Sequence, residues 1–263
     1  ADAGSAVLLL RVLATLAAGG RGGAGPAPAD PDAFSEARLL ELVRDVSQPG
    51  SIAGTFRAME RAALSVRDRW SADTWRVIDD VAEALERQRA GTQSLSALED
   101  ALDQLVSGLV AFTGLTLEST THEDGWRFMM IGRRFERARN LLRATSATLV
   151  EAGDPELEHA LLESLLLANE SAMTHRRRYR TALDVATATR VLLLDPINPR
   201  SLAFQVGELE QRLAELPRDT DPRELAEEQK ALLRAATRVR LAEAESFSEL
   251  DGSGRREGLA TFA

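Results

Sequence analysis

Apolar side chains recur at helical spacing along most of the chain. Between positions 52 and 70 they fall at every third or fourth residue, which places them on one face of an amphipathic helix. The same periodicity predicts helices over 6–18, 34–46, 52–69, 71–89, 96–118, 123–151, 201–216 and 221–250, and two helices or one kinked helix across 155–194. Alternation typical of strands is hard to find. We therefore predict an all-α protein, a multi-helix antiparallel bundle.

Polar and helix-breaking residues mark the predicted helix boundaries. Ser71, and Ser96 with Glu99, fit the N-cap and capping-box patterns. Pro155 suits the first turn of a helix, and Ser201 follows two prolines that disfavour helix before them. The connections are short, and short connections between long helices imply antiparallel neighbours.

The two ends of the chain are predicted to differ from the bundle, which we place at 34–250. The apolar stretch 6–18 is too short to span a bilayer and is predicted to form a core helix, followed by a Gly/Ala/Pro-rich loop within 1–33. Because the chain begins with Ala1, we expect a truncated N-terminus. Residues 251–263 are predicted to form a flexible tail.

Composition narrows the classes of function. Acidic residues outnumber basic ones by 41 to 32, giving a net charge of −9, so we expect neither a nucleic acid nor a membrane as partner. Cysteine is absent, which excludes disulfides and thiolate chemistry and makes a cytoplasmic location the expectation. Only Lys230 is a lysine among the basic residues. The arginine bias reflects either fixed pairing with carboxylates and phosphates or genomic base composition.

Two stretches of the chain share one charged template, Arg-x-x-Glu-Arg-Ala-x4-Arg. Its members are Arg57, Glu60, Arg61, Ala62 and Arg67 in the first copy, and Arg133, Glu136, Arg137, Ala138 and Arg143 in the second. At about 100° per residue, the charged positions of each copy share one face of a helix. The opposite face of the second helix is predicted to be core, through Phe128, Ile131, Phe135, Leu142 and Leu149.

Two interpretations of this template stay open. Both faces could be solvated and carry i,i+3 Arg–Glu pairs worth tenths of a kcal/mol. Alternatively, the two copies face each other across a pseudo-twofold axis and form a shared polar layer. Because arginines outnumber glutamates in the motif, such a layer would leave guanidinium donors for a carboxylate or phosphate.

Several segments carry a resemblance to a known family. They are GWRFMMIGRRFERARNLL at 125–142, THRRRYR at 174–180, the stretch 191–206, and RAMERAALSVRDR at 57–69. In this order they resemble the bacterial alpha-E family, an uncharacterised helical domain named for its Glu-Arg motif, over about 34–247. The chain departs from the family pattern in lacking a further first helix with its own Glu-Arg-Ala motif.

The resemblance implies a genomic context and partner proteins more than a reaction mechanism. Family members are encoded beside, or fused behind, a circularly permuted ATP-grasp ligase, often near transglutaminase-like peptidases, and a role in peptide synthesis or protein modification is inferred for them. The family's motif residues match Glu60, Arg133, Glu136 and Arg137, with Arg177, Tyr179, Asp195 and Arg200 in the other shared segments.

Rival chemical signals are weak. Glu156-x-x-His159 has half the spacing of a carboxylate-bridged di-metal site, but no second copy exists in the sequence. We predict no metal and no cofactor. Three hypotheses remain: an accessory domain for an ATP-grasp ligase that binds a peptide or other carboxylate, an enzyme that uses Glu60 or Glu136 as acid or base, and a purely structural helical adaptor.

Overall fold

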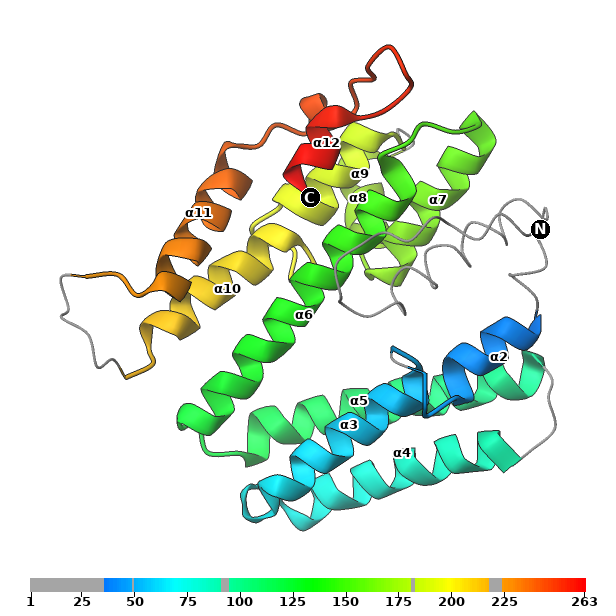
Figure 1. Cartoon of the computed structure of the whole chain (residues 1–263), viewed down its shortest axis with the longest axis vertical. Helices are drawn as coiled ribbons and strands as arrows, with labels where there is room; N and C mark the ends of the chain where they lie inside the picture. Colours follow the sequence, from blue (N-terminus) through cyan, green and yellow to red (C-terminus); the bar gives the residue numbers. More distant parts are fainter. Residues whose placement is uncertain (1–35, 49, 91–94, 181–182, 218–223) are drawn as a thin grey trace. The chain divides into compact units, whose positions relative to one another are not determined.

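The computed structural model describes residues 36–48, 50–90, 95–180, 183–217 and 224–263 (Figure 1). Within these ranges the regular structure is helical, with one isolated β-bridge between Glu151 and Arg255, so the predicted all-α fold is confirmed. None of the described helices is long and apolar enough to cross a membrane. The predicted helix 6–18 and the loop after it lie outside the described residues.

The chain divides into two compact units where a single bundle was predicted. The described part of the first unit is 36–122, and that of the second is 123–263. Each unit has its own set of packed helices. The two copies of the charged template therefore belong to different units.

The unit 36–122 is built on three longer helices and a short one. Its elements are α2 (Glu36–Arg44), α3 (Ile52–Ser65), the 3-10 turn η2 (Arg67–Arg69), α4 (Ala72–Ala90) and α5 (Leu95–Ser119). Phe56, Ile78, Val81 and Leu105 form the centre of its core. At Gly108 of α5 a Cβ atom would collide with the side chain of Val81 on α4, so the glycine lets these two helices approach closely.

The predicted helix starts in this unit are largely confirmed. Ser51 caps α3 by accepting a hydrogen bond of 2.9 Å from the Gly54 amide, and Ser71 accepts one of 3.1 Å from the Thr74 amide at the start of α4. The predicted cap at Ser96 is not formed in this way, because α5 already includes Leu95.

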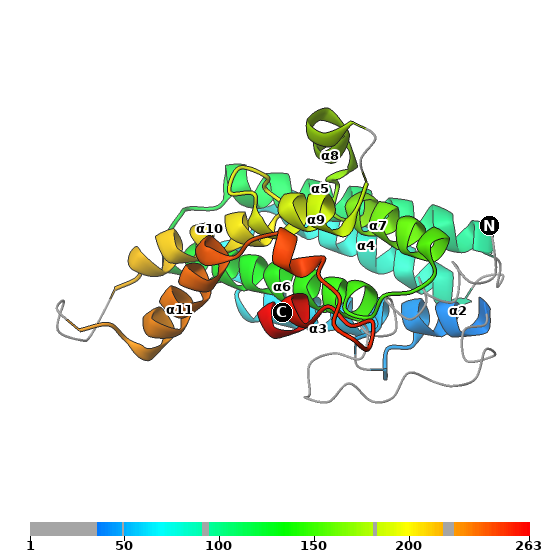
Figure 2. The ribbon, with the colours of Figure 1, turned by 90° about the horizontal axis from the view of Figure 1, so that it is seen from above.

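The unit 123–263 contains more and shorter elements than predicted. They are α6 (Asp124–Leu149), α7 (Pro155–Ala168), α8 (Ala172–Tyr179), α9 (Val185–Thr189), the π-helical turn η3 (Arg190–Leu194), α10 (Leu202–Ala214), α11 (Glu227–Leu241), the 3-10 turn η4 (Glu245–Phe247) and α12 (Glu257–Phe262). Within this unit α10 lies alongside both α6 and α11. Helix α8 protrudes from the unit (Figure 2) but contacts α7 and α9.

The buried face of α6 differs from the predicted one. Phe128 and Phe135 are 61% and 55% exposed, so placing them in the core was wrong, whereas Leu149 is buried as predicted. The buried face consists of Trp126, Met130, Ala138, Leu141, Ala144, Thr145, Thr148 and Leu149. Four of these are alanine or threonine, whose small side chains let neighbouring helices approach but give a weak hydrophobic signal.

The C-terminal segment is packed where the sequence predicts a long helix and a flexible tail. Helix α11 ends at Leu241, and the last residues form α12, in which Leu259 is fully buried. The guanidinium of Arg256 donates to the carbonyl oxygen of Leu149 at 2.8 Å and to the carboxylate of Glu158 at 2.5 Å. These bonds fasten the segment to the ends of α6 and α7.

Candidate functional site

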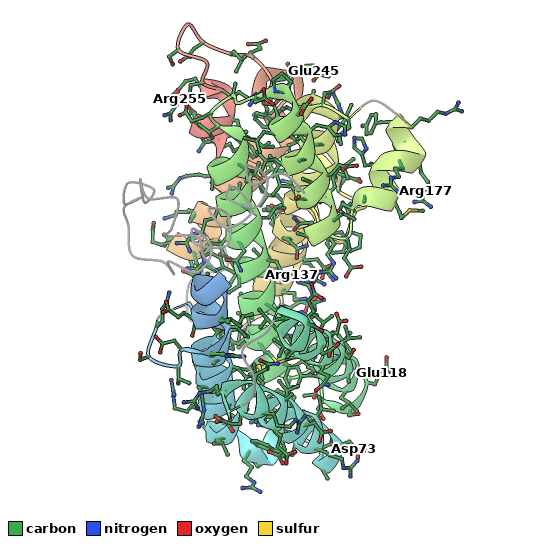
Figure 3. The ribbon with its side chains drawn as sticks, turned by 90° about the vertical axis from the view of Figure 1, so that its right-hand side faces the viewer. Asp73, Glu118, Arg137, Arg177, Glu245 and Arg255 are labelled. Atoms are coloured by element: carbon green, nitrogen blue, oxygen red, sulfur yellow. The ribbon has the colours of Figure 1, made fainter. Side chains whose placement is uncertain are left out.

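The second copy of the charged template lies on α6. Arg133 and Arg137 are one helical turn apart, so their side chains leave the same face, and Figure 3 labels Arg137 on this helix. Both arginines are partly buried. Glu136 is exposed and forms an ion pair of 2.6 Å with Arg139.

The turn before α10 brings Arg200 to this face. Asn198 is buried, and its side-chain amide donates hydrogen bonds to the hydroxyl of Ser171 and to the backbone carbonyl oxygen of Val191, each at 3.0 Å. The side-chain carbonyl oxygen of Asn198 accepts a hydrogen bond of 3.1 Å from the backbone amide of Arg200. Ser201 then caps α10, as predicted, through the Phe204 amide at 3.1 Å. This network fixes the backbone from which the Arg200 side chain extends.

Arg134 joins α6 to α10. Its guanidinium lies 3.1 Å from the carboxylate of Glu208, donates to Gln205 at 3.3 Å, and stacks over the Phe204 ring at 5.3 Å. Glu208 also pairs with Arg212 at 3.1 Å. One carboxylate thus serves two guanidinium groups, which leaves this part of the interface with surplus positive charge.

We call Arg133, Arg134, Arg137 and Arg200 the arginine cluster. Burial, followed by the neighbouring charges of Arg133, Arg200 and Arg134, lowers the pKa of Arg137 to about 10. Burial also lowers the pKa of Arg133, and Arg134 and Arg200 add to that effect. The guanidinium groups therefore act on one another across a partly dehydrated space.

Two carboxylates form ion pairs with members of this cluster. Glu208 neutralises part of Arg134, and Glu170 lies 3.3 Å from Arg200 in an exposed pair. Across the described ranges, Arg137 has neither a hydrogen bond nor an ion pair from its side chain. An anion placed between these groups would relieve their repulsion and could accept bidentate hydrogen bonds.

The first copy of the template, on α3, is largely engaged within its own unit. Arg57 pairs with Glu86 of α4 at 2.7 Å, and Arg89 pairs with the same carboxylate at 2.9 Å. The hydrogen bonds from Arg57 and then Arg89 lower the pKa of Glu86. Arg57 and Glu60 line a cavity of about 230 Å³ between these helices.

The other arginines of the first copy are exposed. Arg61 lies on the surface of α3, and the guanidinium of Arg67 stacks over the Trp75 ring at 5.4 Å. Because the two copies belong to different units, a polar layer shared between them stays a prediction.

The remaining candidates lie elsewhere in the unit 123–263. Asp195 is buried, accepts from the Ile197 amide at 3.1 Å, and pairs with Arg178 at 2.6 Å. The Tyr179 ring packs on that of His175 with 5.2 Å between centroids. Arg177 is exposed on α8, apart from Arg137 on α6 (Figure 3). The structure therefore brings Arg200, but not Arg177, to the arginine cluster.

Sequence reasoning missed three members of this region: Arg134, Gln205 and Glu208. Arg134 directly follows Arg133 but occupies a variable position of the duplicated template, so the template did not select it. Glu156 and His159, the rival metal signal, are both exposed. The part of the chain that the structure describes contains no group of three His, Cys, Asp or Glu residues arranged to hold a metal ion.

The comparisons with known proteins agree with this architecture. A family model named Alpha-E, described as a predicted alpha-helical domain with a conserved ER motif, matches residues 6–263. The chain belongs to the Alpha-E family. Its Glu-Arg pairs in the duplicated template are Glu60-Arg61 and Glu136-Arg137.

The Alpha-E chain also has curated relatives in mycobacteria. It is 34% identical over 247 residues to an uncharacterized protein of Mycobacterium tuberculosis (strain ATCC 25618 / H37Rv) and, equally, to one of Mycobacterium bovis. The alignment covers 90% of the Alpha-E chain but 27% of each relative. No solved structure matches it. In these relatives the Alpha-E region is thus one part of a much longer polypeptide.

Proposed function

We propose that this Alpha-E domain binds the carboxylate or phosphate group of a ligand at the arginine cluster, as a non-catalytic accessory to a circularly permuted ATP-grasp ligase in peptide synthesis or protein modification. The observation that carries the binding part is the position of Arg137. The charges of Arg133, Arg134 and Arg200 act on it and lower its pKa, and no carboxylate pairs with it in the described ranges.

The physical argument for an anion is one of charge balance. Gathering like charges in a partly dehydrated space is unfavourable, and the nearby carboxylates of Glu208 and Glu170 already serve Arg134, Arg212 and Arg200. Guanidinium groups match the geometry of carboxylates and phosphates, so either group would be bound by charge-assisted hydrogen bonds.

The ligase partnership rests on the family resemblance. Members of this family are encoded beside or fused behind ATP-grasp ligases, and the mycobacterial relatives contain about three quarters of their length outside the matched region. A helper that holds a carboxylate or a phosphate would suit the peptide synthesis or protein modification that the resemblance implies.

The binding part is tested by thermal denaturation in phosphate, glutamate and short acidic peptides, with chloride at matched ionic strength as reference. Wild type is compared with Arg137→Gln and with Arg139→Gln, which removes the same charge two residues away. At tenfold the dissociation constant, a bound ligand stabilises the folded state by about 1.4 kcal/mol. We expect this shift in wild type and Arg139→Gln and its loss in Arg137→Gln. Equal shifts in all three proteins would reject the site.

The ligase part is tested separately by co-purification of the domain with an ATP-grasp protein encoded near it. Capture of the ligase by wild type and by Arg137→Gln, with no ligand shift in either, would favour a purely structural adaptor. If the domain turned over a ligase substrate alone, and Glu136→Gln abolished turnover without weakening ligand binding, the enzyme hypothesis would replace the accessory role.

A further inference from the structure

A second cavity lies on the side of α10 that faces α11. Its volume is about 580 Å³, within the range of small-molecule sites, which is roughly 300–1,000 Å³. All residues that line it belong to the unit 123–263. Apolar side chains from three elements contribute to its wall, among them Leu194, Val206 and Val239.

Two arginines from different elements border this apolar wall. Arg190 comes from η3 and Arg240 from α11. Arg190 pairs with Glu245, whose side chain is 67% exposed, and Arg240 pairs with Glu210. Exposed ion pairs contribute little to stability, so a ligand carboxylate could replace Glu245 at small cost.

Glu208, which lines the cavity together with Glu210, is already neutralised. Glu208 pairs with Arg134 and Arg212 on its other side. Each of the two wall arginines has one carboxylate partner, Glu245 for Arg190 and Glu210 for Arg240. An anionic ligand would replace the exposed Glu245 on Arg190, whereas a cationic ligand would meet the two guanidinium groups.

The π-helical turn contributes directly to this site. Arg190 and Leu194 are the first and last residues of η3, and both line the cavity. The π-helix is rare and occurs mostly as single turns, frequently at functional sites. Here the turn supplies one charged and one apolar side chain to the same space.

We propose that this cavity binds a small amphipathic carboxylate, with its apolar body against the wall formed by Leu194, Val206 and Val239 and its carboxylate on Arg190 and Arg240. This site uses neither Arg137 nor Arg200. The experiments that test this site are therefore independent of those that test the proposed function.

Gly207 offers a way to fill the cavity without disturbing the fold. It lines the cavity from the middle of α10, and a Cβ atom added there meets nothing within 4 Å. A leucine at this position would extend into the space that the ligand needs. Gly114 in α5 has the same open surroundings but lies in the other unit, so Gly114→Leu is the matched control.

The experiment is isothermal titration of the full chain with decanoate, decanol and decylamine, each below its micellar concentration. We expect one saturable site for decanoate, with decylamine and decanol at least about tenfold weaker, because only the carboxylate can pair with the two arginines. Gly207→Leu should weaken decanoate binding at least about tenfold. Gly114→Leu and Arg137→Gln should bind decanoate as wild type does.

A second variant tests the polar end of the site. The double substitution Arg190→Gln/Arg240→Gln should reduce decanoate affinity to that of decanol and leave decanol affinity unchanged, which also keeps the proposal testable if Gly207→Leu fails to fold. The proposal is overturned by the absence of saturable decanoate binding, by decylamine or decanol binding as tightly as decanoate, or by wild-type affinity in a folded Gly207→Leu variant. Loss of binding in Arg137→Gln would also overturn it, because that result would assign the ligand to the arginine cluster.

Discussion

Removing the charge of Arg137 is expected to stabilise the protein in the absence of ligand. A base whose pKa is lowered by folding holds its proton less favourably in the folded than in the unfolded state. For Arg137 this penalty is present in full at every pH below about 10 and disappears as the pH rises from there toward the ordinary pKa of arginine. At neutral pH, Arg137→Gln should therefore raise the free energy of unfolding.

The size of the effect follows from the pKa of Arg137. The fall of this pKa from the ordinary arginine value to about 10 corresponds to roughly 3 kcal/mol at about 1.36 kcal/mol per pH unit. Because the side chain is only partly buried, solvent screens much of this, and we expect a net gain of about 1 kcal/mol. Glutamine retains part of the aliphatic stem, so little packing is lost.

Urea denaturation in low-salt, phosphate-free buffer, followed by circular dichroism, measures this difference. Arg139→Gln is the control, since it removes a guanidinium that pairs with Glu136 at 2.6 Å and should leave stability unchanged or slightly lower. If Arg137→Gln instead destabilised the protein by about 1 kcal/mol or more, the repulsion that supports an anion site would be absent. Added phosphate should narrow the gap between wild type and Arg137→Gln by stabilising wild type alone.

Three further predictions concern the stability of the unit 123–263. Burial lowers the pKa of His175, so the free energy of unfolding should fall as the pH drops through the unfolded value of 6.5, and thermal denaturation of His175→Gln should show a weaker pH dependence there. Arg256→Ala should cost about 3 kcal/mol in urea denaturation, because it breaks a largely buried ion pair; an unchanged midpoint would mean that α12 does not stabilise the unit. In Gly258→Ala a Cβ atom would collide with the Ser246 carbonyl oxygen, so we expect a loss of roughly 1–3 kcal/mol, whereas Gly252→Ala, with open space around it, should melt as wild type does.

The helices and their caps could be predicted because their causes are local. Ser71 and Ser201 each accept a hydrogen bond from an amide three residues later, and that geometry depends only on the adjacent chain. The early end of α11 and the π-helical turn at 190–194 could not be predicted, because tertiary packing decides them. The exposed Phe128 and Phe135 show the same limit, since periodicity identifies a possible face but not the neighbour that covers it.

Only part of the arginine cluster could be predicted from the spacing of residues in the sequence. The spacing of Arg133 and Arg137 places them on one face of any helix. Arg200, by contrast, reaches them through the network around Asn198, whose partner Ser171 lies 27 residues away in the chain. No local pattern encodes such an encounter.

The two copies of the duplicated template make different side-chain interactions in this chain. In the first copy, Arg57 is committed to Glu86 across α3 and α4, and in the second, Arg137 has no such counter-charge in the described ranges. Because each copy belongs to a unit with its own packed helices, a substitution that adapts one copy to a task need not disturb the other. In an internal repeat of this kind, one copy can stabilise the packing of its unit while the other copy changes to bind a ligand.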